Sequence, residues 1–269
     1  MINNNDHIIL KTKDLSIGYT SKKRSTVIAS NINIELKKGC LVGLIGANGI
    51  GKSTLLKTLT KVQNPLLGDV LINNISLLKY EPISLAKVMS LVLTEPIAAK
   101  NLSVLELVSL GRQPYTNWIG NLSKKDLLIV NKALEQTNLL HLKHHKIFEL
   151  SDGQLQKVMI ARALAQDTDL IILDEPTTHL DMYHKAYILN LLQKLAKETN
   201  KTILFSSHEI DLAIQLCDTL IVMTKDAVVS NTPCNHITKG TFKTLFPEGL
   251  INFDEKTGRF IIKKNNQVF

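Results

Sequence analysis

The chain has 269 residues, 44% of them hydrophobic, and a formal net charge of +8 at pH 7, which predicts a globular protein of one large domain or two small ones. Its apolar runs are far shorter than the ~20 residues of a bilayer-spanning helix, and its N-terminus lacks a basic leader and an apolar stretch, so we expect neither a membrane span nor a signal peptide. Scattered basic residues argue against nucleic-acid binding, and three widely spaced cysteines favour a reducing cytosol over a disulfide scaffold.

The first predicted elements are strands. Residues 8–19 and 27–36 alternate apolar and polar positions, which predicts two strands of an antiparallel sheet with one solvated face. The continuous apolar run at 40–46 predicts a strand buried on both faces. The segment STLLKTLTKV has helical spacing, so a helix is expected after a glycine turn.

Buried-strand patterns recur in the second half of the chain. They occur at 169–174, 202–207 and 219–223, with helical patterns at 183–198 and 209–217. Strands that alternate with helices predict an α/β fold in which a parallel sheet is covered on both faces.

Two other regions differ from this alternation. Between about 96 and 150 the strand patterns disappear, and SVLELVSLG, KKDLLIVNKALEQTN and the lead into residue 150 predict a helical insertion. After about residue 230 we expect short mixed elements, with a turn that leads into a strand at FDEKTGRFII.

The segment GANGIGKST matches the phosphate-loop pattern G-x-x-x-x-G-K-[ST] and follows a predicted strand, as the motif requires. Its glycines let backbone N–H groups turn toward phosphate oxygens, and the helix that follows adds its positive dipole end. We expect Lys52 to reach the β and γ phosphates of ATP, Ser53 to hold Mg²⁺ and Thr54 to assist at the α phosphate. The predicted nucleotide-binding residues of this loop are Gly46, Asn48, Gly49, Gly51, Lys52, Ser53 and Thr54.

Two later strand ends carry chemistry. Asp174 ends the apolar strand in DLIILDEP, where a carboxylate can hold Mg²⁺ through water, and Glu175 is expected to orient a water for attack on the γ phosphate. His208 ends the strand in TILFSSHE and is expected to donate a hydrogen bond to the γ phosphate. Taken alone, an acidic pair after a strand is as often an ordinary solvated turn as a functional site, and a histidine at a strand end is more often structural. The phosphate loop in the same chain favours the functional interpretation of both.

The order of phosphate loop, LSDGQ at 150–154, DLIILDEP and strand-end histidine resembles the nucleotide-binding subunit of an ABC transporter, over essentially the whole chain. LSDGQ is similar to the family signature LSGGQ, with Asp152 in place of the first glycine. The resemblance implies that two copies face each other head to tail, so that the signature of one closes over the ATP of the other. Ser151 and the Gly153 backbone, at the start of a helix, are suited to bind a γ phosphate, and Gln154 could reach the nucleotide sugar. Ser151 is also suited to be the N-cap of that helix, and both roles can hold at once.

The resemblance also implies a P-loop NTPase (RecA-like) core with an N-terminal antiparallel β subdomain and an inserted α-helical subdomain. Residues 1–269 would form a single ATPase domain. Within it, residues 1–95 with 155–230 would form the core and β subdomain, 96–154 the helical subdomain with the signature, and 231–269 a C-terminal extension.

Further positions carry over by resemblance. Tyr19 matches an aromatic residue that stacks on adenine, and Asp181 matches a loop that links the two active sites. The family's Mg²⁺-contacting glutamine is replaced: Thr94 stands at that position, with Glu95 beside it, and which of the two takes the metal contact stays open.

Three segments resemble the corresponding regions of the ATPases of siderophore, haem or cobalamin importers. They are NLSVLELVSLGRQPYTNWIG, SSHEIDLAIQLCD and the tail from TFKTLF to RFII. The implied cofactors are ATP and Mg²⁺, and the implied partners are a second copy, a transmembrane permease touching residues near 94–112 and, indirectly, an extracytoplasmic substrate-binding protein. The implied location is the cytoplasmic face of the bacterial inner membrane, which the positive charge suits. The alternatives are a soluble ABC-type ATPase acting on ribosomes or DNA and a module that binds ATP without hydrolysing it.

Overall fold

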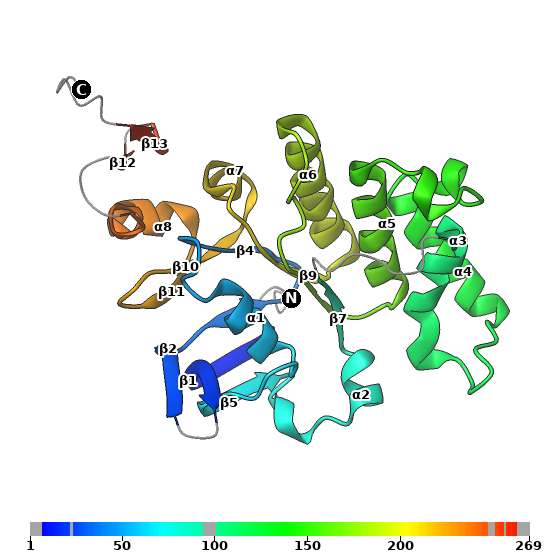
Figure 1. Ribbon diagram of the computed structural model, residues 1–269, viewed down its shortest axis with the longest axis horizontal. Coiled ribbons are helices and arrows are strands. Elements are labelled where there is room, and N and C mark those ends of the chain that lie inside the picture. Colours follow the sequence, from blue (N-terminus) through cyan, green and yellow to red (C-terminus); the bar gives the residue numbers. More distant parts are fainter. Residues whose placement is uncertain (1–6, 22–23, 94–100, 247–250, 256, 263–269) are drawn as a thin grey trace, which may run out of the picture.

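The computed structural model describes residues 7–21, 24–93, 101–246, 251–255 and 257–262 (Figure 1). Two sheets form its centre. In the first, β1 (Ile8–Ser21) pairs antiparallel with β2 (Arg24–Ile32), β3 (Glu35–Lys37) and β5 (Leu67–Ile72), and β5 pairs with β6 (Ile75–Ser76). This confirms the predicted antiparallel β portion.

The second sheet is the predicted parallel one. Its strand order is β11 (Val228–Asn231), β10 (Thr219–Met223), β4 (Leu41–Gly46), β9 (Thr202–Ser206), β8 (Leu170–Leu173) and β7 (Met89–Val92), and only β11 runs antiparallel to its neighbour. Because β4, β8 and β9 are adjacent and parallel, the loops that follow them emerge at one edge of the sheet.

Both faces of the parallel sheet are buried. On β4, Val42 and Leu44 pack into the cluster that contains α1 (Lys52–Leu59), whereas Leu41 and Ile45 pack into the cluster that contains α6 (Met182–Thr199). This alternation is the side-chain period of a strand, and it explains why the sequence of β4 contains only apolar side chains and two glycines. In Figure 1, α1 lies between the two sheets, and α6 and α7 (Ile210–Leu216) lie on the other face.

The predicted helical insertion consists of α3 (Val104–Ser109), η3 (Leu110–Tyr115) and α4 (Lys124–Gln136), which pack with α5 (Asp152–Ala165) at one side of the molecule (Figure 1). Serines that accept hydrogen bonds from the backbone three residues on begin three of these helices: Ser103 for α3, Ser123 for α4 and Ser151 for α5. Such capping boxes satisfy N–H groups that a helix start leaves unpaired.

The lead into residue 150, which we expected to be helical, forms only short 3-10 turns, η4 (Leu140–Leu142) and η5 (Ile147–Glu149). The reason is local: Leu150 and Ser151 have extended backbones because Ser151 is the N-cap of α5. The remaining helices are α2 (Pro82–Ala86), η2 (Leu77–Lys79), α8 (Pro233–Thr238) and η6 (Thr241–Thr244).

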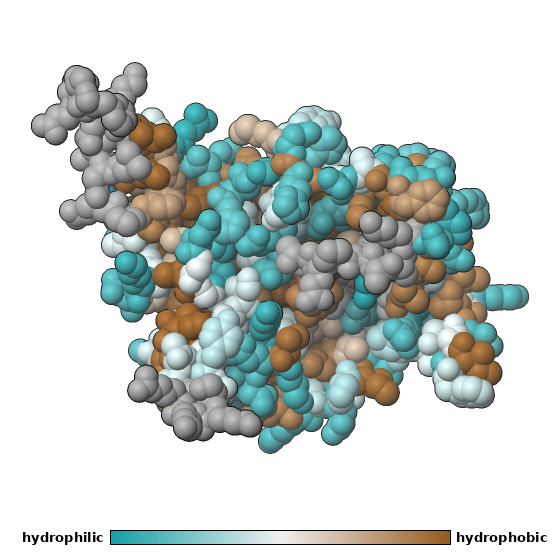
Figure 2. Space-filling model, viewed as in Figure 1, coloured by the Kyte–Doolittle hydropathy of each residue, from teal (hydrophilic) through white to brown (hydrophobic). Residues whose placement is uncertain are grey.

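The C-terminal segment ends in a hairpin, β12 (Ile251–Asp254) and β13 (Arg259–Ile262), at the opposite side from the helical insertion (Figure 1). Its aromatic side chains pack together, with the ring centroids of Phe242 and Phe253 4.8 Å apart. Within the described residues, none of the helices is long and apolar enough to cross a bilayer, and Figure 2 shows hydrophilic and apolar side chains interspersed over the face in view.

Candidate nucleotide-binding site

The loops after β4, β8 and β9 form a cleft of about 360 Å³, the phosphate-loop cleft. It is lined by Tyr19, Ile28, Asn48, Gly49, Gly51, Lys52, Ser53, Thr54, Glu175 and His208. Residues from four separate parts of the chain therefore meet where the sequence placed a triphosphate. Ile28, from β2, was not among the predicted residues, because nothing in an alternating strand says which apolar side chain faces a ligand.

The phosphate loop, residues 46–54, needs its glycines. Gly49 and Gly51 have φ values of 74° and 113°, in the left-handed region that residues with a Cβ rarely adopt. A Cβ on Gly46 would lie 2.5 Å from the carbonyl oxygen of Met223 in β10. The loop thus turns tightly against the sheet, and α1 begins at Lys52 with no acidic residue in its first turn. Its N-terminal N–H groups and dipole suit an anion.

Lys52 crosses the inside of this loop. Its ammonium donates to the carbonyl oxygens of Gly46 at 3.0 Å and Ala47 at 3.2 Å, and the residue is 5% exposed. Burial lowers the pKa of the Lys52 ammonium, and the nearby carboxylates of Glu175 and Asp174 oppose that change. A buried cation held by weak neutral acceptors is well placed for phosphate oxygens.

A set of oxygen atoms lies beside Lys52. Asp174 is buried and its Oδ1 accepts a hydrogen bond from the Ser206 hydroxyl at 2.7 Å, with the Ser53 hydroxyl 3.5 Å away. A carboxylate next to a serine hydroxyl is the donor set that Mg²⁺ takes at phosphate sites, so the residues fit that ion. Sequence reasoning missed Ser206, although its position at the end of an apolar strand was a signal.

Glu175 and His208 contact each other. The Glu175 Oε1 and His208 Nε2 atoms are 2.7 Å apart, and Glu175 Oε2 accepts a hydrogen bond from Thr178 at 3.0 Å. The backbone of Glu175 is left-handed, with φ of 47°, and its N–H donates to the Ser206 hydroxyl at 2.8 Å. Strained backbones of this kind cluster at functional sites. The sequence predicted both side chains at the γ phosphate but not their mutual contact.

Tyr19 lies at the rim of the cleft. Its hydroxyl is 2.8 Å from the Thr54 hydroxyl, and 54% of the residue is exposed. The structure therefore brings the predicted adenine-stacking residue to the predicted nucleotide site, from β1 of the other sheet.

The signature segment, residues 150–154, lies elsewhere. Ser151, Gly153 and Gln154 line a different cavity, of about 330 Å³, which shares none of its lining residues with the phosphate-loop cleft. Ser151 and Gln154 satisfy each other: the Gln154 N–H donates to Ser151 Oγ at 3.3 Å, and the Ser151 N–H donates to Gln154 Oε1 at 2.9 Å. The helix N-cap interpretation of Ser151 is confirmed.

Asp181 also lies outside the phosphate-loop cleft, where it caps α6. Its carboxylate accepts hydrogen bonds from the His184 N–H and from His184 Nδ1, both at 2.8 Å. These hydrogen bonds lower the pKa of the Asp181 carboxyl.

Thr94 and Glu95, the candidates for the altered metal contact, lie outside the described residues. Arg112, at the end of the segment expected to touch a permease, is 4% exposed. Its guanidinium donates to Asp126 and to the Ala165 carbonyl oxygen, both at 2.9 Å, so this side chain holds the helical insertion together.

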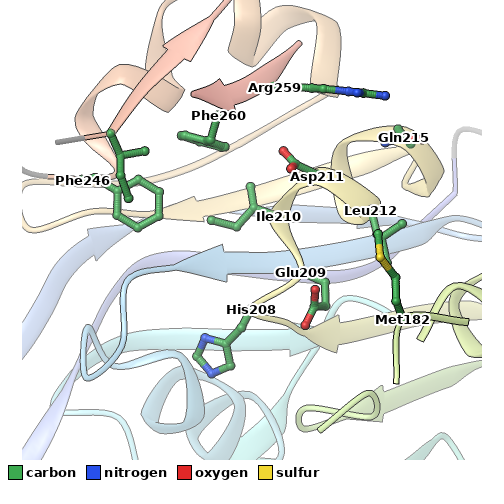
Figure 3. Close-up of a pocket in the computed structure, with 11 residues that line it drawn as sticks. Met182, His208, Glu209, Ile210, Asp211, Leu212, Gln215, Phe246, Arg259 and Phe260 are labelled. Carbon is green, nitrogen blue, oxygen red and sulfur yellow. The ribbon is translucent and has the colours of Figure 1, made fainter. Parts of the chain in front are cut away.

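A third cavity, of about 430 Å³, lies on the other side of His208, between α7 and the C-terminal hairpin (Figure 3). Ile210, Phe246 and Phe260 lie at one end of it, and Met182 and Leu212 at the other. Sequence reasoning did not predict this cavity, because its walls come from residues 182–260 and meet only in the fold.

Comparison with known proteins gives a consistent result. A family model described as ABC transporter matches residues 29–178. The iron(3+)-hydroxamate import ATP-binding protein FhuC of Bacillus subtilis (strain 168) is 39% identical over 238 residues, 88% of this chain and 87% of that protein. The structure of cbiO1 from Clostridium perfringens, part of the ABC transporter complex cbiONQ, has a TM-score of 0.75 at 29% identity over 88% of this chain and 93% of that one.

A dimeric structure of the ATP-binding cassette MJ0796, in a post-hydrolysis state bound to ADP and Pi, has a TM-score of 0.70 at 28% identity over 83% of this chain and 98% of that one. The matched family region holds the phosphate loop, the signature segment and the Asp174–Glu175 pair. The chain therefore belongs to the ABC transporter family, as an ATP-binding subunit and ATPase.

Proposed function

We propose that this chain works as a head-to-tail dimer that hydrolyses ATP with Mg²⁺ and thereby powers uptake of an iron chelate, haem or cobalamin through a separate membrane permease. The observation that carries the catalytic part is the contact between Glu175 and His208 at the edge of the phosphate-loop cleft, beside the buried Lys52.

In this proposal the phosphate loop positions the triphosphate. Backbone N–H groups from Gly46 to Thr54 surround the phosphates, and Lys52 exchanges its carbonyl partners for β and γ oxygens. Ser53 and Asp174 would hold Mg²⁺, with Thr94 or Glu95 as the candidate for the remaining contact. The ion neutralises phosphate charge when bound. Tyr19 stacks on the adenine ring.

Glu175 then orients the attacking water. Thr178 and His208 each hold one of its carboxylate oxygens, and the hydrogen bond from its N–H to Ser206 fixes the strained backbone. Because its backbone is anchored on Ser206 and its Oε2 is held by Thr178, the Glu175 carboxylate has one direction in which to accept the proton of a water. When ATP is present, His208 exchanges Glu175 for the γ phosphate, which leaves Glu175 Oε1 for the water, and it so reports that phosphate to the residues of α7 that follow it.

The second copy supplies the signature segment. Ser151, Gly153 and Gln154 lie away from the phosphate-loop cleft of their own chain, and Ser151 is exposed at the start of α5. A helix N-terminus that lies at the surface suits a phosphate presented by another molecule. Asp181 accepts hydrogen bonds from His184, which lines the same cavity, and it links the two sites in the proposal.

The cargo and location follow from the relatives. The name of FhuC from Bacillus subtilis describes iron(3+)-hydroxamate import, and that protein aligns with 88% of this chain. The proposal places the chain at the cytoplasmic face of the cell membrane, with a permease contact near residues 94–112 and an extracytoplasmic substrate-binding protein as an indirect partner. Residues 96–154 act as its helical subdomain, 1–95 with 155–230 as its core and β subdomain, and 231–269 as an extension.

The catalytic proposal is tested with Glu175→Gln. Nucleotide affinity should stay within about twofold, whereas ATP turnover by the assembled complex should fall by about a hundredfold or more, the usual worth of a general base. Glu209→Gln is the matched control, because Glu209 lies outside the phosphate-loop cleft and should leave turnover nearly unchanged. Near-normal turnover in Glu175→Gln overturns the assignment.

The cargo proposal needs a separate experiment. Cells that carry Glu175→Gln should lose uptake of radiolabelled ferric hydroxamate, haem or cobalamin, and the tagged chain should copurify with a membrane permease. Copurification with ribosomes or DNA, together with unchanged uptake of all three, would instead support the soluble ATPase alternative.

A further inference from the structure

The imidazole of His184 lies between two segments that the proposed dimer uses. His184 is in the first turn of α6. Its backbone nitrogen lies 2.8 Å from Oδ1 of Asp181, and its ring Nδ1 atom lies 2.8 Å from Oδ2 of the same carboxylate. Because a carboxylate oxygen only accepts, Nδ1 carries the proton in this contact. The two hydrogen bonds fix the direction of the ring.

The other edge of the same ring faces the signature segment. A Cβ built on Gly153 would lie 2.8 Å from Cδ2 of His184, so only glycine lets α5 approach the ring this closely. Tyr183 packs edge-on against the ring, with centroids 5.5 Å apart. Ser151, Gly153, Gln154 and His184 line the same cavity of about 330 Å³.

One turn further along, α5 and α6 meet again. The Lys157 ammonium lies 5.4 Å from the centroid of the Tyr187 ring, and both residues line the same cavity. A cation over an aromatic face is attractive. This second contact joins the two helices one turn beyond the His184 ring, whose side chain is 49% exposed at the edge of the cavity.

We propose that His184 is a positioning residue that couples the signature segment of a subunit to its Asp181 loop. The inference rests on the proposed function, because it takes the signature segment to bind the nucleotide of a second copy. A shift of either segment moves the ring, and the ring transmits the shift through a directional hydrogen bond on one edge and close packing on the other. His184 therefore acts on the partner's nucleotide without touching the nucleotide in its own chain.

Two substitutions separate the contacts. His184→Phe keeps a ring against Gly153 but has no donor for Asp181, whereas His184→Asn places an amide nitrogen near the position of Nδ1 but loses the outer part of the ring. Both should weaken the coupling. His144→Phe is the matched control, because His144 is exposed and lies outside both cavities.

The test uses the full chain in the Glu175→Gln background and measures ATP-driven dimerisation by sedimentation. Loss of one hydrogen bond of ordinary strength is worth about fivefold, and each dimer contains two copies, so His184→Phe should weaken dimerisation by about 25-fold. The affinity of the monomer for a fluorescent ATP analogue should stay within about twofold, since His184 is outside the phosphate-loop cleft. His144→Phe should change neither quantity.

A double-variant cycle identifies the route. If His184 acts through Asp181, then His184→Phe and Asp181→Asn together should weaken dimerisation by less than the product of their separate effects. Unchanged dimerisation in His184→Phe, or fully multiplicative effects in the double variant, overturns the inference. Failure of Glu175→Gln itself to dimerise with ATP would overturn the proposed function instead, so the two failures are distinguishable.

Discussion

A single hydroxyl, that of Ser206, organises the acidic pair at the end of β8. It donates to Asp174 Oδ1 and accepts from the Glu175 N–H, and the residue is fully buried. The left-handed conformation of the Glu175 backbone, with φ of 47°, costs about 1–3 kcal/mol and persists only because surrounding contacts such as this one hold it. The proposed metal-binding carboxylate, Asp174, and the proposed base, Glu175, thus share one anchor, which comes from the neighbouring strand β9.

Ser206→Ala should therefore lower both turnover and stability. Removal of the hydroxyl leaves a buried N–H and a carboxylate oxygen without this partner, which costs about 1–3 kcal/mol of unfolding free energy in urea titrations. ATP turnover should fall by about tenfold or more, because both catalytic groups lose alignment. Ser207→Ala is the control: Ser207 is also buried, but its hydroxyl contacts the Glu209 N–H. Equal turnover in the two variants would contradict the shared anchor.

At the scale of residues, the sequence identified groups but not their partners. Lys52, Asp174, Glu175 and His208 stand in recognisable motifs, and the structure brings them to one cleft or its wall. Ser206 acquires its role only because β9 pairs with β8 in the register that sets Phe205 opposite Leu173. A register of that kind depends on contacts between residues 32 apart, and no local pattern encodes it.

At the scale of elements, one arginine joins the helical insertion. The Arg112 guanidinium donates to Asp126 at the start of α4 and to the Ala165 carbonyl at the end of α5, and it lies 4.0 Å from the centroid of the Tyr115 ring. Hydrogen bonds from Ser123, with a further contribution from Arg112, lower the pKa of the Asp126 carboxyl. Asp126 therefore remains charged, and its charge is buried next to one cation.

Arg112→Met should destabilise this insertion strongly. Loss of the guanidinium leaves Asp126 buried without its cation, which typically costs about 3–5 kcal/mol. Addition of Asp126→Leu should restore part of that loss, because the double variant has no unpaired charge. Lys194→Met is the control, since its pair with Glu198 is exposed and should contribute less than about 1 kcal/mol. Chemical unfolding monitored by circular dichroism gives all three values; equal losses for Arg112→Met and Lys194→Met would refute the buried-pair argument.

The sequence predicted elements best where one pattern dominated. The apolar runs of β4, β8, β9 and β10 predicted buried strands, and the structure confirms them. The edge strand β11 and the two-residue β6 gave no signal, because both are short and neither contains a fully buried position. The predicted strand at 27–36 is divided into β2 and β3, since β1 pairs with them at different halves of its length.

At the scale of the whole molecule, the C-terminal segment is tied to the parallel sheet by a buried histidine. His236 in α8 is fully buried, and its Nε2 lies 2.9 Å from the Leu220 carbonyl oxygen of β10, so Nε2 carries the proton. Within the described residues, the Nδ1 atom has no hydrogen-bond partner. Burial lowers the pKa of the His236 imidazole, the Leu220 carbonyl opposes that change, and Lys239 adds to it.

Stability should consequently fall in mild acid. Below the ordinary histidine pKa of 6.5 the unfolded chain binds a proton at residue 236 that the folded chain resists, so the free energy of unfolding decreases as the pH falls from 7.5 to 5.5. His236→Asn, which keeps a polar side chain but cannot titrate, should show a shallower decrease. Urea midpoints at the two pH values measure the difference, with the exposed His144→Asn as control. Parallel decreases in wild type and His236→Asn would contradict this account.

The separation of the phosphate-loop cleft from the cavity of the signature segment could not be predicted from the sequence by physical reasoning alone. Residues 46–54 and 150–154 are distant in sequence and remain in separate cavities after folding. Family resemblance supplied the expectation of a second copy, whereas the geometry of this chain contributes the exposed start of α5 and the His184 contact.

The position of α1 indicates which part of the chain stays fixed during the proposed ATP cycle. Leu55, Leu56 and Leu59 are almost completely buried among side chains of both sheets, directly behind the phosphate loop. Because these side chains are close-packed, α1 is held firmly against both sheets. We therefore expect the phosphate loop in front of it to change shape little when nucleotide binds. Any tilting during the proposed ATP cycle is therefore expected in the helical insertion, which packs with α5 at one side of the molecule.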